Sequence, residues 1–355
     1  MREYTHLLDP TRHSTIANAG GREMVKGLDV VGFNYIVQND VDNQKKNNPT
    51  WKIVGTEETT GCGTRGWYFK DEKYPGRMVS LNRTMEQNYE NIIERGWKFY
   101  DERPWAAGLF YWTGFDYRGE PNPLSYPAHD SEFGILDYCV FPKDEAYYLK
   151  SWWTDEPVLH IFPHWNLQGH EGEEVEVWAY SNCDEVELTV NGKKLGRQPM
   201  PRNGHLKWKA VYQPGRVEAT GYKNGKRILT KTIETTKAAA KVVLKADRHQ
   251  IAADGQDMAI VNIELHDQKG RFVPNASPVL TFCLEGDANI IGCGNGDPSY
   301  LGSDHPDKQP CHTFSIPAFN GRAQVLIQCG KLPSTVTLKC TADGLKYGLL
   351  TITTK

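Results

Sequence analysis

The sequence lacks the features that would place it among nucleic-acid-binding or membrane-spanning proteins. Its 355 residues carry a net charge of −3, so there is no basic excess to attract the phosphate backbone of a nucleic acid. No apolar run approaches the roughly 20 residues that a helix needs to cross a bilayer. The segment that begins at Met1 is polar and contains no apolar core of a signal peptide. We therefore predict no nucleic-acid partner and no membrane partner.

Motifs for metals and redox cofactors are also lacking. The eight cysteines include no Cys-x-x-Cys pair, and neither they nor His160, His164 and His205 have the spacing of metal ligands. We predict no metal and no cofactor, and we expect most cysteines to be buried free thiols. A disulfide among the five cysteines from Cys283 to Cys340 is left open.

The first 154 residues read as alternating strands and helices. A helix is predicted over about 80–103, because its apolar residues recur at intervals of three and four. Alternation of this kind is typical of parallel βα units, and four such strands are too few for a closed eight-stranded barrel. Polar or aromatic residues end these strands, which favours a shared site at one edge of the sheet. The predicted strands lie at 14–19, 28–35, 51–57 and 107–112.

Beyond about residue 154 the pattern changes to an alternation of apolar and polar residues, which indicates half-buried strands. Asn191-Gly192 and Asn224-Gly225 fall where tight hairpin turns need a positive φ. About seven short strands over some eighty residues predict an immunoglobulin-like sandwich, and the same texture returns after the linker at 235–241. We thus predict three domains: part of a barrel at 1–154, a sandwich at 155–236 and a second sandwich at 237–355.

The candidate site is centred on Ile53-Val-Gly-Thr-Glu57, where a short apolar strand ends in a carboxylate. The ends of parallel strands carry the active sites of such folds, so Glu57 is a candidate nucleophile or acid/base group. A solvated loop acid or an ion-pair partner is the alternative from this stretch alone.

Several segments together resemble glycoside hydrolase family 2, the β-galactosidase-like glycosidases. The resemblance covers nearly the whole chain, in order. It implies strands five to eight of a (β/α)₈ barrel followed by two β-sandwiches, a carbohydrate substrate and no cofactor. The barrel segments are Leu8-Asp-Pro-Thr-Arg12, residues 29–35, residues 53–57 with 64–66, and residues 110–117 with 119–121. The sandwich segments are 162–165, 186–192, 253–257 and 294–298.

The resemblance implies a retaining mechanism in which one carboxylate attacks the anomeric carbon and a second acts as acid and base. By position Glu57 matches the nucleophile, and Glu58 is its rival; adjacent strand residues point to opposite faces, so only one can face the site. Tyr35 matches a tyrosine that orients the nucleophile, and Trp112 matches an aromatic floor beneath the sugar ring. Asn34, Asp116 and Glu120 are candidates for contacts to sugar hydroxyls. For Asp116 and Glu120 a loop-stabilising role is the alternative.

One departure from the family pattern concerns the acid/base residue. In the family this glutamate follows an asparagine, and the sequence contains no Asn-Glu pair. We therefore expect the acid/base group to be absent, and this chain by itself to hydrolyse its substrate poorly or not at all. The family implies a periplasmic or secreted parent enzyme that hydrolyses terminal β-linked sugars, above all β-galactosides, and a homodimer is possible. The alternative is a non-catalytic carbohydrate-binding or structural module, with Trp165 and Trp178 as candidate binding residues.

Overall fold

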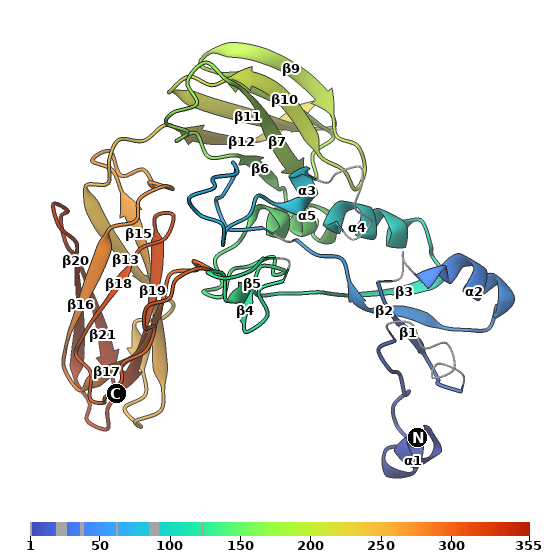
Figure 1. Cartoon of the computed structure of the whole chain (residues 1–355), viewed down its shortest axis with the longest axis horizontal. Coiled ribbons are helices and arrows are strands. Elements are labelled where there is room, and N and C mark those ends of the chain that lie inside the picture. Colours follow the sequence, from blue (N-terminus) through green and yellow to red (C-terminus); the bar gives the residue numbers. More distant parts are fainter. Residues whose placement is uncertain (1, 19–26, 36–38, 62, 85–91, 123) are drawn as a thin grey trace.

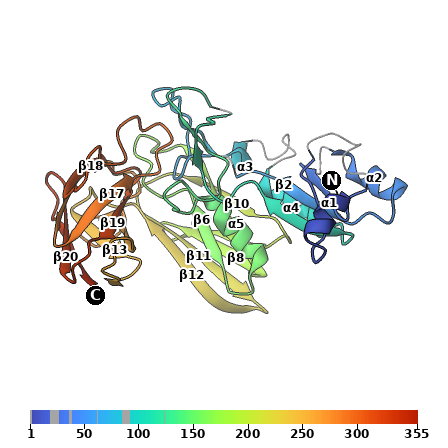
Figure 2. The same cartoon turned by 90° about the horizontal axis from the view of Figure 1, so that it is seen from below.

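The computed structural model describes residues 2–18, 27–35, 39–61, 63–84, 92–122 and 124–355. The described chain is mostly β and consists of several units arranged along the sequence (Figure 1). In two views at right angles, helix α1 and the last strands of the chain lie at opposite ends of the molecule (Figure 2). The domain boundaries at 154/155 and 236/237 stay predictions.

The first unit contains a parallel sheet with the strand order β1-β2-β3. Val31 pairs with Ile53, and Ile53 pairs with Ala106, which confirms three of the four predicted parallel strands. The sheet does not close into a barrel within the described residues. The elements of this unit are α1 (Arg2–Leu8), β1 (Val31–Asn34), α2 (Val41–Asn47), β2 (Ile53–Glu58), α3 (Leu81–Thr84), α4 (Ile93–Asp101), β3 (Ala106–Tyr111), β4 (Tyr117–Arg118), β5 (Asp130–Ser131) and α5 (Asp144–Trp153).

The strand predicted at 14–19 is wrong for the residues described. Residues 14–18 are not a regular strand, although they lie beside β1. Ser14 O accepts a hydrogen bond from Val30 N at 3.1 Å, and Asn18 O accepts one from Asn34 N at 2.9 Å. Two bonds four residues apart are too few for a ladder. Residue 19 lies outside the described residues.

The single helix predicted over 80–103 is also wrong. The chain forms two helices there, α3 and α4, and residues 85–91 lie outside the described part. Ile92 is extended, with φ −69° and ψ 148°, and forms a β-bridge with Thr60. The apolar spacing nevertheless identified a buried face, because Ile92 and Ile93 are both fully buried. Tyr100, at the end of α4, packs with Val31, Phe33 and Ile53 of the sheet.

The second unit is a pair of antiparallel sheets, β10-β7-β6 and β12-β11-β8-β9, that share one core. Asn191-Gly192 and Asn224-Gly225 have positive φ, as predicted for the two hairpin turns. Trp165, Val177, Leu188 and Val217 lie in the core between the sheets. The strands are β6 (Leu159–Phe162), β7 (Glu174–Ser181), β8 (Glu185–Val190), β9 (Lys193–Pro199), β10 (Leu206–Val211), β11 (Arg216–Lys223) and β12 (Lys226–Glu234).

The third unit repeats this arrangement with the sheets β13-β15-β19-β17 and β14-β21-β20-β16-β18. Their inner faces enclose a second core, with Val261, Phe282, Ile327 and Leu338 fully buried. The strands are β13 (Lys241–Ala246), β14 (Gln250–Ile251), β15 (Met258–His266), β16 (Val279–Glu285), β17 (Ala288–Gly294), β18 (Thr313–Pro317), β19 (Arg322–Cys329), β20 (Thr335–Thr341) and β21 (Gly348–Thr354).

The described cysteines are all free thiols, so no disulfide forms among the five cysteines from Cys283 to Cys340. Cys62 lies outside the described residues. None of the described helices is both long and apolar enough to cross a membrane. Within the same residues no group of three His, Cys, Asp or Glu side chains is placed to hold a metal ion.

Candidate active site

The site is built where β1 and β2 end side by side. Asn34, the last residue of β1, pairs in register with Glu57 near the end of β2. Asn34 Nδ2 donates to Glu57 Oε2 at 3.0 Å, and the Tyr35 hydroxyl donates to Glu57 Oε1 at 2.7 Å. Each carboxylate oxygen thus receives one hydrogen bond from a neutral donor. These two bonds fix the orientation of the carboxylate.

The donors themselves are held by their neighbours. The Thr56 hydroxyl donates to Asn34 Oδ1 at 2.9 Å, which turns the amide nitrogen of Asn34 toward Glu57. Tyr35 has a left-handed backbone, with φ 53°, and its N–H donates to Glu57 O at 2.7 Å. Asn39 Nδ2 donates to the carbonyl oxygens of Asn34 and Tyr35 at 2.6 and 3.0 Å. The turn after β1 is therefore tied down around Glu57.

Glu58 points to the opposite side of the sheet. Only 1% of its surface is exposed, and Tyr100 of α4 donates its hydroxyl hydrogen to Glu58 Oε1 at 2.6 Å. Burial raises the pKa of Tyr100, and the Glu58 carboxylate raises it further, so the phenol stays protonated as a donor. A carboxylate buried beneath a helix has no room for a sugar. This geometry favours Glu57 over Glu58 as the nucleophile.

Trp112 follows β3, the strand beside β2. The backbone N–H of Trp112 donates to the backbone oxygen of Glu58 at 2.8 Å, and this bond joins the ends of the two strands. The indole is half-buried and lies edge-on to Tyr117, with 5.8 Å between ring centroids and 72° between planes. Trp112 is therefore placed at the same edge of the sheet as Glu57. Its predicted role as the floor of a sugar site stays a prediction.

Asp116 and Glu120 lie in the loop after Trp112 and differ in their surroundings. Asp116 is buried, and its Oδ1 accepts from Lys143 Nζ at 2.7 Å and from Gly134 N at 2.9 Å. Burial raises the pKa of Asp116 to about 7, although Lys143 acts in the opposite direction. These contacts are those of the loop-stabilising alternative. Glu120 is exposed and accepts a long hydrogen bond, 3.5 Å, from the Tyr117 hydroxyl.

Three residues of the site were missed by sequence reasoning: Thr56, Asn39 and Tyr100. Thr56 carries a weak signal, because it precedes the carboxylate and its hydroxyl can reach the neighbouring strand. Asn39 and Tyr100 carry none, since their contacts depend on the turn after β1 and on the packing of α4.

The alternative of a binding module placed its sugar contacts on Trp165 and Trp178. The structure contradicts this choice, because only 1% of the surface of Trp165 and 0% of the surface of Trp178 are exposed. Both rings face inward: the Trp165 indole N–H donates to Gln213 O, and His205 stacks on Trp178 with 3.9 Å between centroids. Neither ring can serve as a platform for a ligand in this fold.

Comparisons with known proteins find similar chains among the glycoside hydrolases. A model of glycoside hydrolase family 2 C-terminal domain 5 matches residues 242–351, and a domain of unknown function, DUF4982, matches residues 172–229. The chain is 35% identical over 369 residues to β-galactosidase BoGH2A of Bacteroides ovatus, across 97% of the chain and 42% of that protein. The chain carries a family 2 C-terminal domain, and as a whole it is similar to the C-terminal portion of glycoside hydrolase family 2 enzymes.

Other glycosidases resemble the chain as well. A β-glucuronidase of Formosa agariphila is 35% identical over 159 residues, which cover 44% of the chain and 16% of that protein. The crystal structure of a β-glycosidase from Bacteroides vulgatus matches with a TM-score of 0.83 and 29% identity, over 99% of the chain and 48% of that structure. The chain thus corresponds to the C-terminal portion of family 2 enzymes and spans less than half the length of these relatives.

Proposed function

We propose that this chain supplies the nucleophile of a retaining β-glycosidase, with Glu57 as that nucleophile and β-galactosides as its substrates. The observation that carries the proposal is the pair of hydrogen bonds to Glu57 from Asn34 and Tyr35 at the end of β2. The similarity to a β-galactosidase supports galactosides as the substrates, and the similarity to a β-glucuronidase makes glucuronides the competing class of substrate.

In the proposed reaction, a carboxylate oxygen of Glu57 attacks the anomeric carbon of the terminal sugar. A covalent ester bond forms as the bond to the leaving oxygen breaks, and water later cleaves the ester. Tyr35 and Asn34 hold the carboxylate in line for attack. This positioning lowers the entropic part of the activation barrier for the chemical step. Trp112 would place an apolar face against the C–H face of the sugar.

A second carboxyl group has to protonate the leaving oxygen, about 5–5.5 Å from the nucleophile in retaining enzymes. We assign it to the portion of family 2 enzymes that this chain does not cover. In the same proposal the sheet β1-β2-β3 belongs to the second half of a (β/α)₈ barrel and the two sandwiches are immunoglobulin-like. The parent enzyme would be periplasmic or secreted. A homodimer remains a prediction.

The experiment uses two leaving groups on the same sugar. A 2,4-dinitrophenyl β-galactoside releases a weakly basic phenolate, which leaves without protonation by an acid. The alcohol of an alkyl β-galactoside needs such an acid to leave. We expect a burst of dinitrophenolate of up to one equivalent per chain and no release of the alkyl alcohol. Glu57→Gln should abolish the burst, and the matched variant Glu58→Gln, which keeps a hydrogen-bond acceptor for Tyr100, should retain it. A burst that survives in Glu57→Gln, or no burst from the wild type, would overturn the proposal.

A further inference from the structure

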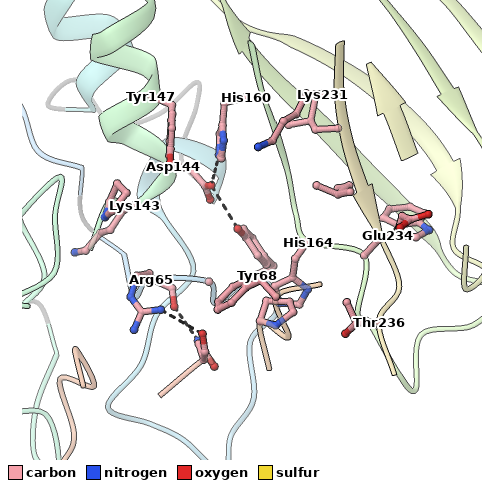
Figure 3. Close-up of a pocket in the computed structure, with 18 of the residues that line it drawn as sticks. Arg65, Tyr68, Lys143, Asp144, Tyr147, His160, His164, Lys231, Glu234 and Thr236 are labelled. Atoms are coloured by element: carbon pink, nitrogen blue, oxygen red, sulfur yellow. Dashed lines mark hydrogen bonds and ion pairs between the residues drawn. The ribbon is translucent and has the colours of Figure 1, made fainter. Parts of the chain in front are cut away.

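A cavity lies away from Glu57, where the three units of the chain meet. Its volume is about 470 Å³, within the range of about 300–1,000 Å³ typical of small-molecule sites. Tyr68 comes from the segment after β2, Asp144 from α5, His160 from β6 and Lys231 from β12 (Figure 3). Glu57 is not among the residues that line it. The cavity is thus a separate place for a ligand.

One wall of this interdomain pocket is a preformed hydrogen-bonded group. His160 Nε2 lies 2.7 Å from Asp144 Oδ1, and the Tyr68 hydroxyl donates to the same oxygen at 3.4 Å (Figure 3). Tyr147 stacks on the His160 ring, with 3.9 Å between centroids and 6° between planes. Rings and polar groups fixed in this way provide apolar faces and hydrogen-bonding atoms together, which is what a sugar ring requires.

The charges of the pocket favour an anion. Its lining contains two acidic side chains, Asp144 and Glu234, and a larger set of basic ones. Burial lowers the pKa of Arg322, its ion pair with Glu264 at 2.8 Å raises it, and the nearby Arg65 lowers it, because the two cations repel each other. A negatively charged ligand would relieve this repulsion. The basic side chains are Arg65, Lys143, Lys231, Arg271 and Arg322.

Lys231 is the cation most available to a ligand. Arg65 is paired with Asp137, Arg271 with Asp267, and Lys143 with Asp116. The exposed Lys231 ammonium, in contrast, makes no ion pair with any residue that the structure describes, and it is directed toward His160 (Figure 3). An incoming anion can therefore pair with Lys231 without breaking an existing bond.

We propose that the interdomain pocket binds an anionic sugar, a sugar ring that carries a carboxylate or a phosphate. Lys231 pairs with the anionic group, and Asp144 and Tyr68 contact the hydroxyls of the ring. The proposal does not rest on the activity assigned to Glu57. Because the pocket exists only in the folded chain, binding also raises the temperature of unfolding by mass action.

Isothermal titration calorimetry with D-glucuronate, glucose 6-phosphate, glucose and inorganic phosphate tests this site. We expect at least one of the two charged sugars to bind ten-fold or more tightly than glucose and than inorganic phosphate. Comparing glucuronate with glucose 6-phosphate shows whether the site prefers a carboxylate or a phosphate. Lys231→Ala should weaken this binding ten-fold or more. Lys226→Ala, an exposed lysine of the same strand outside the pocket, should leave it unchanged, as should Glu57→Gln.

The proposal would be overturned by the absence of binding of either charged sugar at millimolar concentration, by equal binding of glucose, or by undiminished binding to Lys231→Ala. Loss of binding in Glu57→Gln would also do so, because it would place the ligand at β2 instead. A melting curve of each variant without ligand confirms that it is folded, so that weaker binding reports on the pocket.

Discussion

Glu57 and Glu58 show how two adjacent carboxylates acquire different surroundings. Glu57 accepts hydrogen bonds from Asn34 and Tyr35 at the edge of the sheet, whereas Glu58 is buried under α4 beside Tyr100. The alternation of side chains along a strand makes this separation unavoidable. The sequence could predict that only one of the pair faces the site, and the position of α4 decides which.

The Tyr35 hydroxyl should be needed for the reactivity of Glu57. Replacing it in Tyr35→Phe removes a hydrogen bond to a charged oxygen, worth about 1.5–3 kcal/mol. We expect the rate of dinitrophenolate release from a dinitrophenyl glycoside to fall about 10- to 100-fold. Tyr126→Phe is the matched control, because Tyr126 is 77% exposed. An unchanged rate in Tyr35→Phe would show that the hydroxyl does not assist Glu57.

Glu132 should make the stability depend on pH. Burial raises its pKa from 4.5 to about 8. Thr64 donates to Glu132 Oε1, and Oε2 has no hydrogen-bond partner among the described residues. The folded chain thus holds this proton more tightly than the unfolded chain, so stability decreases as the pH rises from about 5 to 8.

Glu132→Gln removes this titration. We expect its melting temperature to exceed that of the wild type by several degrees at pH 8 and to match it within about a degree at pH 5. Glu72→Gln, at an exposed position, serves as the control. Melting curves measured from pH 5 to 8 provide the test. A difference of the same size at both ends of the range would rule out the titration of Glu132 as its cause.

Some residues of the candidate site could be predicted from the sequence, whereas the contacts of others could not. Glu57 and Tyr35 were identified because each ends a short apolar strand in a family-like motif. Asn34 was expected to contact sugar, but its amide is bonded to Glu57 and Thr56. The ion pair of Asp116 with Lys143 spans 27 residues of the chain, and no local pattern reports a contact of that kind.

At the scale of elements, helix α4 packs closely against the residues that follow β2. A Cβ atom at Gly96 of α4 would stand 1.6 Å from Thr59 Cγ2, and Thr59 is buried. Alanine favours a helix over glycine by about 1 kcal/mol, but this gain competes with the clash. The clash is the larger effect in a closely packed interior.

We therefore expect Gly96→Ala to destabilise the chain by about 1–3 kcal/mol. Gly114→Ala is the control, since a Cβ there meets nothing within 4 Å. Its free energy of unfolding should change by less than about 0.5 kcal/mol. Urea unfolding of both variants makes the comparison. A stabilised Gly96→Ala would mean that helix propensity dominates and that α4 is not tightly packed on Thr59.

Periodicity identified the strands of the two sandwiches well, since each has one buried and one exposed face. It failed between residues 80 and 103, where apolar spacing alone could not show that Ile92 leaves the helix to pair with Thr60. It also overestimated residues 14–18, whose apolar residues lie beside β1 without a full ladder. In both cases pairing between distant segments determined the local structure.

At the scale of the whole molecule, Arg65 joins the first unit to the third. Its guanidinium donates to Asp137 Oδ2 at 2.6 Å, to Asn295 O at 2.9 Å and to Phe319 O at 3.0 Å. Arg77 adds an ion pair with Asp297 at 2.7 Å. The fork of a guanidinium serves several acceptors at once, which a lysine cannot do.

Arg65→Lys should therefore loosen the contact between these units. We expect a melting temperature several degrees lower and several-fold faster proteolysis in the segment 235–241 that connects the two sandwiches. Arg248→Lys, an exposed position of the third unit, is the control. Unchanged cleavage in Arg65→Lys would show that the other contacts between the units suffice.

The central claim is that Glu57 is the nucleophile of a glycosidase, and covalent trapping tests it most directly. A 2,4-dinitrophenyl 2-deoxy-2-fluoro-β-galactoside forms the glycosyl ester but releases it slowly, because the fluorine disfavours the charge that develops at the anomeric carbon. After digestion, mass spectrometry of the labelled peptide identifies the modified residue. We predict one fluorosugar on Glu57 and none on Glu57→Gln. A label on Glu58 or on any other residue, or no label at all, would contradict the account.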